Sequence, residues 1–295
     1  MLTYFLLILL FISGYHQRDT EIKTLKSEIE EYLSEQEGTF AVWYQDLQDE
    51  SQHFAINEDT LFHAASTMKT PVMIELFKRV EKGEFSLDDL IKVENKFYSI
   101  VDGSEYQMTF SPESTDPIEK RIGEMATIRE LNHAMITYSS NLATNILIGL
   151  VGAEETTQSM RGLGADRIQV LRGVEDLKAF DQGLSNRTTA KDLGIIFEHI
   201  ANGTSVNPEM DDLMIDILSE QHYGDIIPAK LPDDVTVAHK TGSITGVEHD
   251  SGIVYLPDGS SYVLIFLSKN LPDNVKGREI GAEVSQMIYD FVASR

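Results

Sequence analysis

Three short motifs carry the side chains with which this sequence could do chemistry. They are Ser66–Lys69 (STMK), Ser139–Asn141 (SSN) and Lys240–Gly242 (KTG). A serine hydroxyl is a weak nucleophile at neutral pH and needs a neighbouring base to take its proton. If Ser66 opens a helix, Lys69 lies one turn further along the same face and can be that base. Its pKa must then fall, through burial or a nearby positive charge such as the lysine of the third motif.

Each motif taken alone has an ordinary structural interpretation. The first would be a helix N-cap followed by a solvated lysine, the second a polar junction between helices, and the third the exit from a strand into a turn. Only the ordered combination of all three favours a catalytic site.

Together the motifs resemble the set found in penicillin-recognising serine hydrolases, and in class A β-lactamases in particular. The resemblance implies that Ser66 is the nucleophile and Lys69 its base. It further implies that Ser139 passes a proton to the leaving nitrogen, and that the Asn141 amide holds the side-chain amide of the substrate. One residue departs from the class A pattern, because Ser140 stands where those enzymes usually carry aspartate. We expect this departure to affect the loop more than the chemistry.

The third motif ends a β-branched run, as expected for an edge strand that lines a cleft. Lys240 supplies a fixed positive charge and Thr241 a hydrogen-bond donor, and Gly242 lets a bound carboxylate approach the backbone closely. The backbone N–H of Ser243 would pair with that of the nucleophile as an oxyanion hole.

A loop over residues 170–188 is where the resemblance implies a glutamate that activates water, in the pattern Glu-x-x-Leu-Asn. This chain has Glu175-Asp176-Leu177-Lys178-Ala179, so that the leucine comes one residue early and the asparagine is absent. Glu175 is the best candidate, and the alternative is a surface acid in a loop. Without a well-held water, acylation could proceed while hydrolysis of the ester stalls.

Two other segments are expected near the cleft. Residues 95–123 look longer than the matching loop of class A enzymes and should border the site. The polar run Glu248–Asp250 follows the third motif, and we expect it to face solvent rather than act in catalysis.

Composition excludes several other functions. The net charge of −24 argues against nucleic acid or an anionic membrane as partner, because phosphate binding needs a clustered basic surface. No cysteine is present, and the 8 histidines show no His-x-x-x-His spacing. We therefore expect no metal site, and the resemblance implies that no cofactor is needed.

The elements that must position these residues predict an α+β fold. A helix over residues 20–36 and strands over 40–47 and 53–56 come first. Strands over 235–240, 249–256 and 261–267 and a helix over 276–292 come last. Most segments between them have helical period, among them 190–201 and 208–219. We expect one antiparallel sheet flanked by the N- and C-terminal helices, with an inserted all-helical subdomain. A single catalytic domain would span 19–295, its α/β half formed by 19–60 with 225–295 and its helical half by 61–224.

The apolar run Leu2–Ile12 is too short to cross a bilayer comfortably and resembles the apolar part of an export signal. The alternative is an uncleaved anchor. We expect residues 1–18 to be removed and the mature protein to be periplasmic or secreted and not inserted in the membrane. The resemblance implies that it is a monomer.

Three functions remain open from the sequence. The preferred one is a β-lactamase that opens β-lactam rings through a Ser66 acyl-enzyme, with Lys69, or Glu175 acting through a water, as the base for acylation. The second is a D-Ala-D-Ala peptidase or penicillin-binding relative with slow deacylation, acting on a peptidoglycan-like acyl substrate. The third is an envelope binding protein without turnover.

Overall fold

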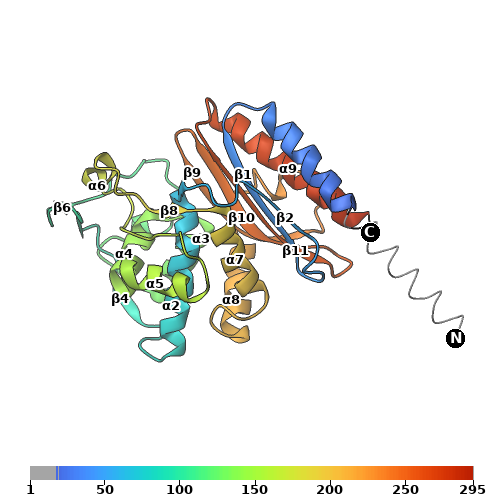
Figure 1. Cartoon of the computed structure of the whole chain (residues 1–295). Coiled ribbons are helices and arrows are strands. Elements are labelled where there is room, and N and C mark those ends of the chain that lie inside the picture. Colours follow the sequence, from blue (N-terminus) through green and yellow to red (C-terminus); the bar gives the residue numbers. More distant parts are fainter. Residues whose placement is uncertain (1–17, 19, 295) are drawn as a thin grey trace, which may run out of the picture.

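A five-stranded antiparallel sheet forms one half of the molecule (Figure 1). The computed structural model describes residues 18 and 20–294, so the apolar run Leu2–Ile12 lies outside the described residues. The strand order is β2-β1-β11-β10-β9. The bounds are Thr39–Asp46 for β1, His53–Ile56 for β2, Thr236–Ile244 for β9, Val247–Tyr255 for β10 and Ser261–Lys269 for β11. Both ends of the chain thus supply strands, as predicted, and the α+β class is confirmed.

Two helices from opposite ends of the chain cover one face of this sheet (Figure 1). One spans residues 20–34, and the other is α9, Asn274–Ala293. In α9, Ile280, Val284 and Ile288 recur every four residues, and all three are buried in the core beneath the sheet. The spacing of the apolar residues therefore decides which side of the helix meets the strands.

The other face of the sheet meets the helical half through α7, Ala190–Ala201. Gly194 allows close packing there, because a Cβ at this position would lie 2.4 Å from the Trp43 indole. The Trp43 ring nitrogen also donates a hydrogen bond of 2.7 Å to Glu198. The remaining long helices of this half are α2 (Lys69–Glu81), α3 (Ile128–Thr137), α4 (Asn141–Val151), α5 (Ala153–Gly162) and α8 (Pro208–Ser219).

The expectation that Glu248–Asp250 faces solvent is wrong. These residues are only 3%, 0% and 0% exposed. They lie on β10, an inner strand of the sheet, which α9 and α7 both contact. Buried polar groups persist only when they are paired. Glu248 accepts from Arg278 at 2.8 Å, and Asp250 lies 2.8 Å from the His239 ring.

The two irregular stretches contain only short elements. Around residues 90–127 these are β4 (Leu90–Lys92), β5 (Phe97–Tyr98), β6 (Glu105–Tyr106), η2 (Glu119–Arg121) and β7 (Met125–Thr127). The later stretch holds α6 (Leu177–Asp181) and β8 (Arg187–Thr188), which pairs with β3 (Phe62–His63). Short 3-10 turns are η1 (Ala65–Met68) and η3 (Pro228–Lys230). Within the described part of the chain, no helix is long and apolar enough to cross a membrane. The proposed boundaries of the two halves stay a prediction.

Candidate active site

Ser66 lies in η1, directly before α2, and Lys69 is the first residue of α2. The Lys69 side chain is fully buried. Its Nζ donates to the Ser139 carbonyl at 2.7 Å, to the Ser139 hydroxyl at 3.1 Å and to Asn141 Oδ1 at 2.9 Å. These contacts use all three ammonium protons. No described residue hydrogen-bonds to the Ser66 hydroxyl, which therefore remains available in the cleft.

The second motif places its side chains through a helix cap. Ser140 is the N-cap of α4, and its hydroxyl accepts from the Ala143 N–H at 3.0 Å. Serine and aspartate are comparably good N-caps, so the departure at this position preserves the local structure. The preceding Ser139 has a φ of 55°, a left-handed conformation that is uncommon outside glycine. Ser139 and Asn141 consequently both contact the Lys69 ammonium, one from each side of the cap.

Lys240, on β9, reaches the Ser139 hydroxyl, which also contacts Lys69. Its Nζ donates to Ser139 Oγ at 3.1 Å and to the Thr241 carbonyl at 2.9 Å, and its side chain is fully buried. One hydroxyl oxygen therefore lies 3.1 Å from each of two lysine nitrogens. This is the convergence of the three motifs that the sequence predicts.

Burial and like charge act on both lysines. Burial first, and then the charge of Lys240, hold the pKa of Lys69 well below its ordinary value, while Asp116 and Glu175 oppose the shift. Burial lowers the pKa of Lys240 to about 7, and Asp250 opposes it. A lowered pKa is what a lysine needs in order to accept a proton near neutral pH.

Gly242 allows the edge strand β9 to approach the nucleophile. A Cβ at Gly242 would lie 3.0 Å from the Ser66 backbone nitrogen and 3.1 Å from that of Thr67. The close approach leaves Ser66 and Ser243 on the walls of the same two cavities. Their backbone N–H groups are the donors proposed for the oxyanion hole.

Glu175 is part of the site despite the irregular spacing of its loop. Its Oε1 accepts from Asn141 Nδ2 at 2.8 Å, and its φ of 61° is left-handed. Asn145 holds the loop at Val174, the residue before Glu175. Its Oδ1 accepts from the Val174 N–H at 2.6 Å, and its Nδ2 donates to the Val174 carbonyl at 3.0 Å. The Asn141 amide thus links Lys69 to Glu175.

The two irregular segments support each other. Asp176 accepts from the Ser99 hydroxyl and from the Ile100 N–H, each at 2.9 Å. Tyr106 donates to the Val174 carbonyl at 3.1 Å. The long segment over residues 95–123 therefore buttresses the Glu175 loop, in addition to bordering the cleft.

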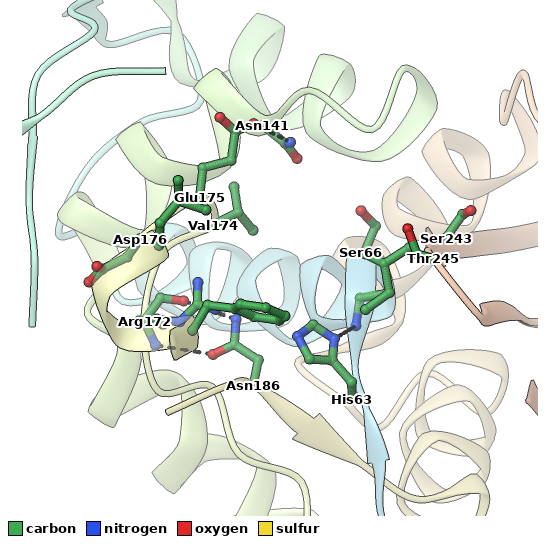
Figure 2. A pocket seen from close by; sticks show the side chains of 14 residues that line it. His63, Ser66, Asn141, Arg172, Val174, Glu175, Asp176, Asn186, Ser243 and Thr245 are labelled. Atoms are coloured by element: carbon green, nitrogen blue, oxygen red, sulfur yellow. Dashed lines mark hydrogen bonds between the residues drawn. The ribbon is translucent and has the colours of Figure 1, made fainter. Parts of the chain in front are cut away.

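Three adjoining cavities form the cleft. The first, of about 330 Å³, includes Ser66, Asn141, Glu175 and Ser243 in its wall (Figure 2). The second, of about 270 Å³, shares Ser66 and Ser243 with the first, and the third, of about 350 Å³, shares Asn141 and Glu175 with it. Ser139 lies in the wall of the second and third cavities. Six of the predicted residues line these cavities: Ser66, Ser139, Asn141, Glu175, Thr241 and Ser243. Lys69, Lys240 and Gly242 are not among the lining residues, and both lysines are fully buried.

Several residues of the cleft were not predicted from the sequence. Arg278 reaches the second cavity from α9, and its guanidinium donates to Glu248. Arg172 and His63 lie in the wall of the first cavity. None belongs to a motif, and nothing in its local spacing distinguishes it from a surface residue. An aligned set of relatives would be the only sequence signal able to find them.

Comparisons with known proteins agree with this geometry. A profile described as the beta-lactamase enzyme family matches residues 24–292. Beta-lactamase VEB-1 of Pseudomonas aeruginosa is 24% identical over 303 residues, covering 95% of this chain and 92% of the relative. Beta-lactamase AST-1 of Nocardia asteroides is 32% identical over 177 residues, 58% of this chain and 57% of the relative.

Solved structures resemble the fold along nearly its full length. A beta-lactamase from Sphaerobacter thermophilus superposes with a TM-score of 0.78 at 24% identity, covering 94% of this chain and 97% of that one. PBP-A superposes with a TM-score of 0.80 at 27% identity, covering 92% and 97%. The coverage shows that the likeness extends over both the sheet and the helical half.

Proposed function

The chain belongs to the beta-lactamase enzyme family, and we propose that it opens β-lactam rings through an acyl-enzyme formed on Ser66. Membership makes it a serine hydrolase of β-lactamase type, which argues against a binding protein without turnover. One observation carries the proposed mechanism. The Ser139 hydroxyl lies 3.1 Å from both the Lys69 and the Lys240 nitrogen, in the wall of a cleft that also contains Ser66.

Acylation begins when neutral Lys69 takes the proton of the Ser66 hydroxyl. The serine oxygen bonds to the lactam carbonyl carbon, and the negative charge that develops on the carbonyl oxygen meets the N–H groups of Ser66 and Ser243. The C–N bond then breaks, and Ser139 gives its proton to the ring nitrogen. A lysine ammonium beside Ser139 restores that proton. Glu175, acting through a water, is the alternative base for the first step.

Substrate binding uses the remaining motif residues. Lys240 and the Thr241 hydroxyl would hold the substrate carboxylate, with Gly242 leaving room for it at the backbone. Asn141 would hold the amide of the acyl side chain. Deacylation then requires Glu175 to direct water at the ester carbonyl, which releases the opened product and restores the Ser66 hydroxyl.

In a second candidate function, Ser66 is still acylated but the ester is hydrolysed slowly, as in a D-Ala-D-Ala peptidase. The local structure of Glu175 favours it. This residue is left-handed, its loop lacks the asparagine of the class A pattern, and its carboxylate is already engaged by Asn141. A variant of the similar PBP-A forms an acyl-enzyme complex with penicillin G, the adduct that both candidates require.

The time course of the Ser66 adduct separates these candidates. The protein is mixed with penicillin G and followed by intact-mass spectrometry, with Ser66→Ala as control. An adduct that forms and disappears, together with turnover of a chromogenic cephalosporin, supports the β-lactamase. A persistent adduct supports the peptidase. If the wild-type protein forms no adduct at any concentration, the acyl-enzyme mechanism is wrong.

We also propose that the enzyme acts outside the cytoplasm as a monomer. The apolar run Leu2–Ile12 motivates the proposed export, and the resemblance to the family motivates the monomer. Cell fractionation and N-terminal sequencing should find a mature chain that begins near Asp19, and size-exclusion chromatography should give the mass of one chain. A full-length protein in the cytoplasm, or a stable dimer, would contradict it.

A further inference from the structure

His63 contacts the backbone immediately before the nucleophile. Its ring Nδ1 lies 3.0 Å from the backbone nitrogen of Ala65, which donates to it (Figure 2). Ala65 has a φ of 45°, a left-handed conformation that crowds its Cβ. Such a conformation persists only where surrounding contacts hold it. The hydrogen bond to His63 is one contact that does so, one residue before Ser66.

The hydrogen bond fixes the tautomer of the neutral ring. Because Nδ1 accepts the hydrogen bond from the Ala65 N–H, a neutral His63 must carry its proton on Nε2. Among the described residues, Nε2 is buried and has no hydrogen-bond partner. The Phe180 ring packs edge-on against His63, with centroids 6.2 Å apart and an interplanar angle of 66°. Among the described residues, the hydrogen bond from Ala65 is thus the one that the ring makes.

The backbone of His63 is anchored independently of its ring. The His63 carbonyl accepts from His249 Nε2 at 2.9 Å. His249 is fully buried on β10, and its Nδ1 accepts from the Ser268 N–H at 3.1 Å. On its other side, His63 pairs with Arg187 in the β3–β8 register. The backbone of His63 is therefore held in place, and this fixes the position from which its ring contacts Ala65.

We propose that neutral His63 is a positioning residue for the nucleophile, holding Ala65 in the left-handed turn that presents Ser66 to the cleft, and that protonation of its ring releases this turn. The role rests on the proposed acylation of Ser66. His63 does not exchange a proton with substrate. It acts only through the backbone of the turn, so its loss lowers the rate of acylation without changing the reaction.

The surroundings determine the direction of the pH effect. Burial first, and then the positive charge of Arg172, lower the pKa of His63 below 6.5. Arg187 on β8 and His249 on β10 add no negative charge, while Glu175 and Asp176 lie in the wall of the same cavity. The ring is thus neutral at neutral pH and becomes charged only as pH falls below 6.5. A protonated Nδ1 would then face the Ala65 N–H, donor against donor.

Two variants separate this role from simple packing. In His63→Asn, the asparagine Oδ1 is bonded to Cγ, as Nδ1 is in histidine. It can therefore accept the hydrogen bond from the Ala65 N–H at any pH. In His63→Leu, volume is kept and the acceptor is lost. The acylation rate of Ser66 by penicillin G is measured against pH, with urea unfolding as the stability control. We expect His63→Leu to acylate roughly ten- to a hundredfold more slowly at pH 7.5, the size expected for a misplaced reacting group.

His63→Asn should acylate within about threefold of the wild-type rate, because its oxygen replaces the lost acceptor. In this variant the acylation rate should also no longer fall at low pH to the extent that protonation of His63 causes the fall in the wild-type protein. Nitrogen-15 NMR of the histidine rings should find His63 neutral at pH 7.5 with its proton on Nε2. A proton on Nδ1, or equal rates and equal pH profiles in all three proteins, would overturn the proposal. If the wild-type protein forms no adduct, the proposed function itself is wrong, and the role of His63 in acylation is wrong with it.

Discussion

Replacing Gly242 with alanine should slow acylation, because the added methyl group would press on the backbone of the nucleophile. The new Cβ would lie 3.0 Å from the Ser66 nitrogen, 3.1 Å from the Thr67 nitrogen and 3.2 Å from the Ala65 Cβ. Ordinary van der Waals contact begins at 3.4 Å. The backbone must therefore move by a few tenths of an ångström, and no flexible side chain is available to move in its place.

The expected size of the effect follows from what moves. In the proposed mechanism, Ser66 contributes both the attacking oxygen and one oxyanion donor, and Ser243, next to Gly242, contributes the other. Loss of one such donor lowers kcat by roughly 10²–10³-fold, and a misplacement of about 1 Å costs about 10²-fold. A smaller displacement should lower the acylation rate by about 10- to 100-fold. That corresponds to about 1.4–2.7 kcal/mol of transition-state stabilisation.

Gly149→Ala is the matched control. Gly149 lies in α4, where an added Cβ meets nothing within 4 Å. Alanine there should add up to about 1 kcal/mol of stability through helix propensity and leave the kinetics unchanged. Both variants are compared with wild type by stopped-flow acylation and by urea unfolding. Equal acylation rates for Gly242→Ala and wild type would refute the close approach of β9 to the nucleophile.

Four other outcomes test the site. Lys240→Met should raise the pKa of Lys69 and move the acid limb of acylation to higher pH, because it removes a neighbouring positive charge; an unmoved limb would contradict this coupling. Binding of a carboxylate-bearing β-lactam should weaken as pH rises through about 7, since Lys240, with its pKa lowered to about 7, loses its charge above that pH; affinity that is constant from pH 6 to 9 would argue against Lys240 as the anion site. Glu175→Gln should slow decay of the adduct by roughly 10²–10⁴-fold while acylation continues, and decay at the wild-type rate would leave this acid without a role in hydrolysis. Asn145→Ala removes both hydrogen bonds to Val174, and it should lower the free energy of unfolding by roughly 1–3 kcal/mol and slow deacylation; a stable variant with normal deacylation would show that the loop is held elsewhere.

Local patterns in the sequence predicted most regular elements well. The helix over Ala190–Ala201 and the helix over Pro208–Ser219 have the predicted ends. Both carry an apolar stripe of helical period, and both begin at a capping side chain, Thr189 and Asn207 respectively. The three C-terminal strands were found but are longer than predicted. Strand β9, for example, continues through Ile244, because pairing with β10 extends a strand past its β-branched residues.

The catalytic motifs were also recoverable from the sequence, for a different reason. Ser66 and Lys69 are close along the chain, so the chemistry of a hydroxyl beside an amine can be inferred without knowing the fold. Their meeting with Ser139 and Lys240 was a prediction that rested on the resemblance of three ordered motifs. Both lysines hydrogen-bond to Ser139, and Ser66 lies in the wall of the same cavity as Ser139, while the catalytic roles of these residues stay a prediction.

The tertiary structure alone decided the surroundings of that chemistry. Glu248–Asp250 reads as a polar, solvated run, yet it is buried, because strand order places β10 inside a sheet that helices cover on both faces. His63 reads as an isolated histidine, and only the fold brings its ring against the backbone of Ala65. Side-chain type and local spacing determine which reactions a chain is equipped for. Long-range packing determines the pKa values and the backbone geometry under which those groups act, and it depends on residues that are distant in sequence.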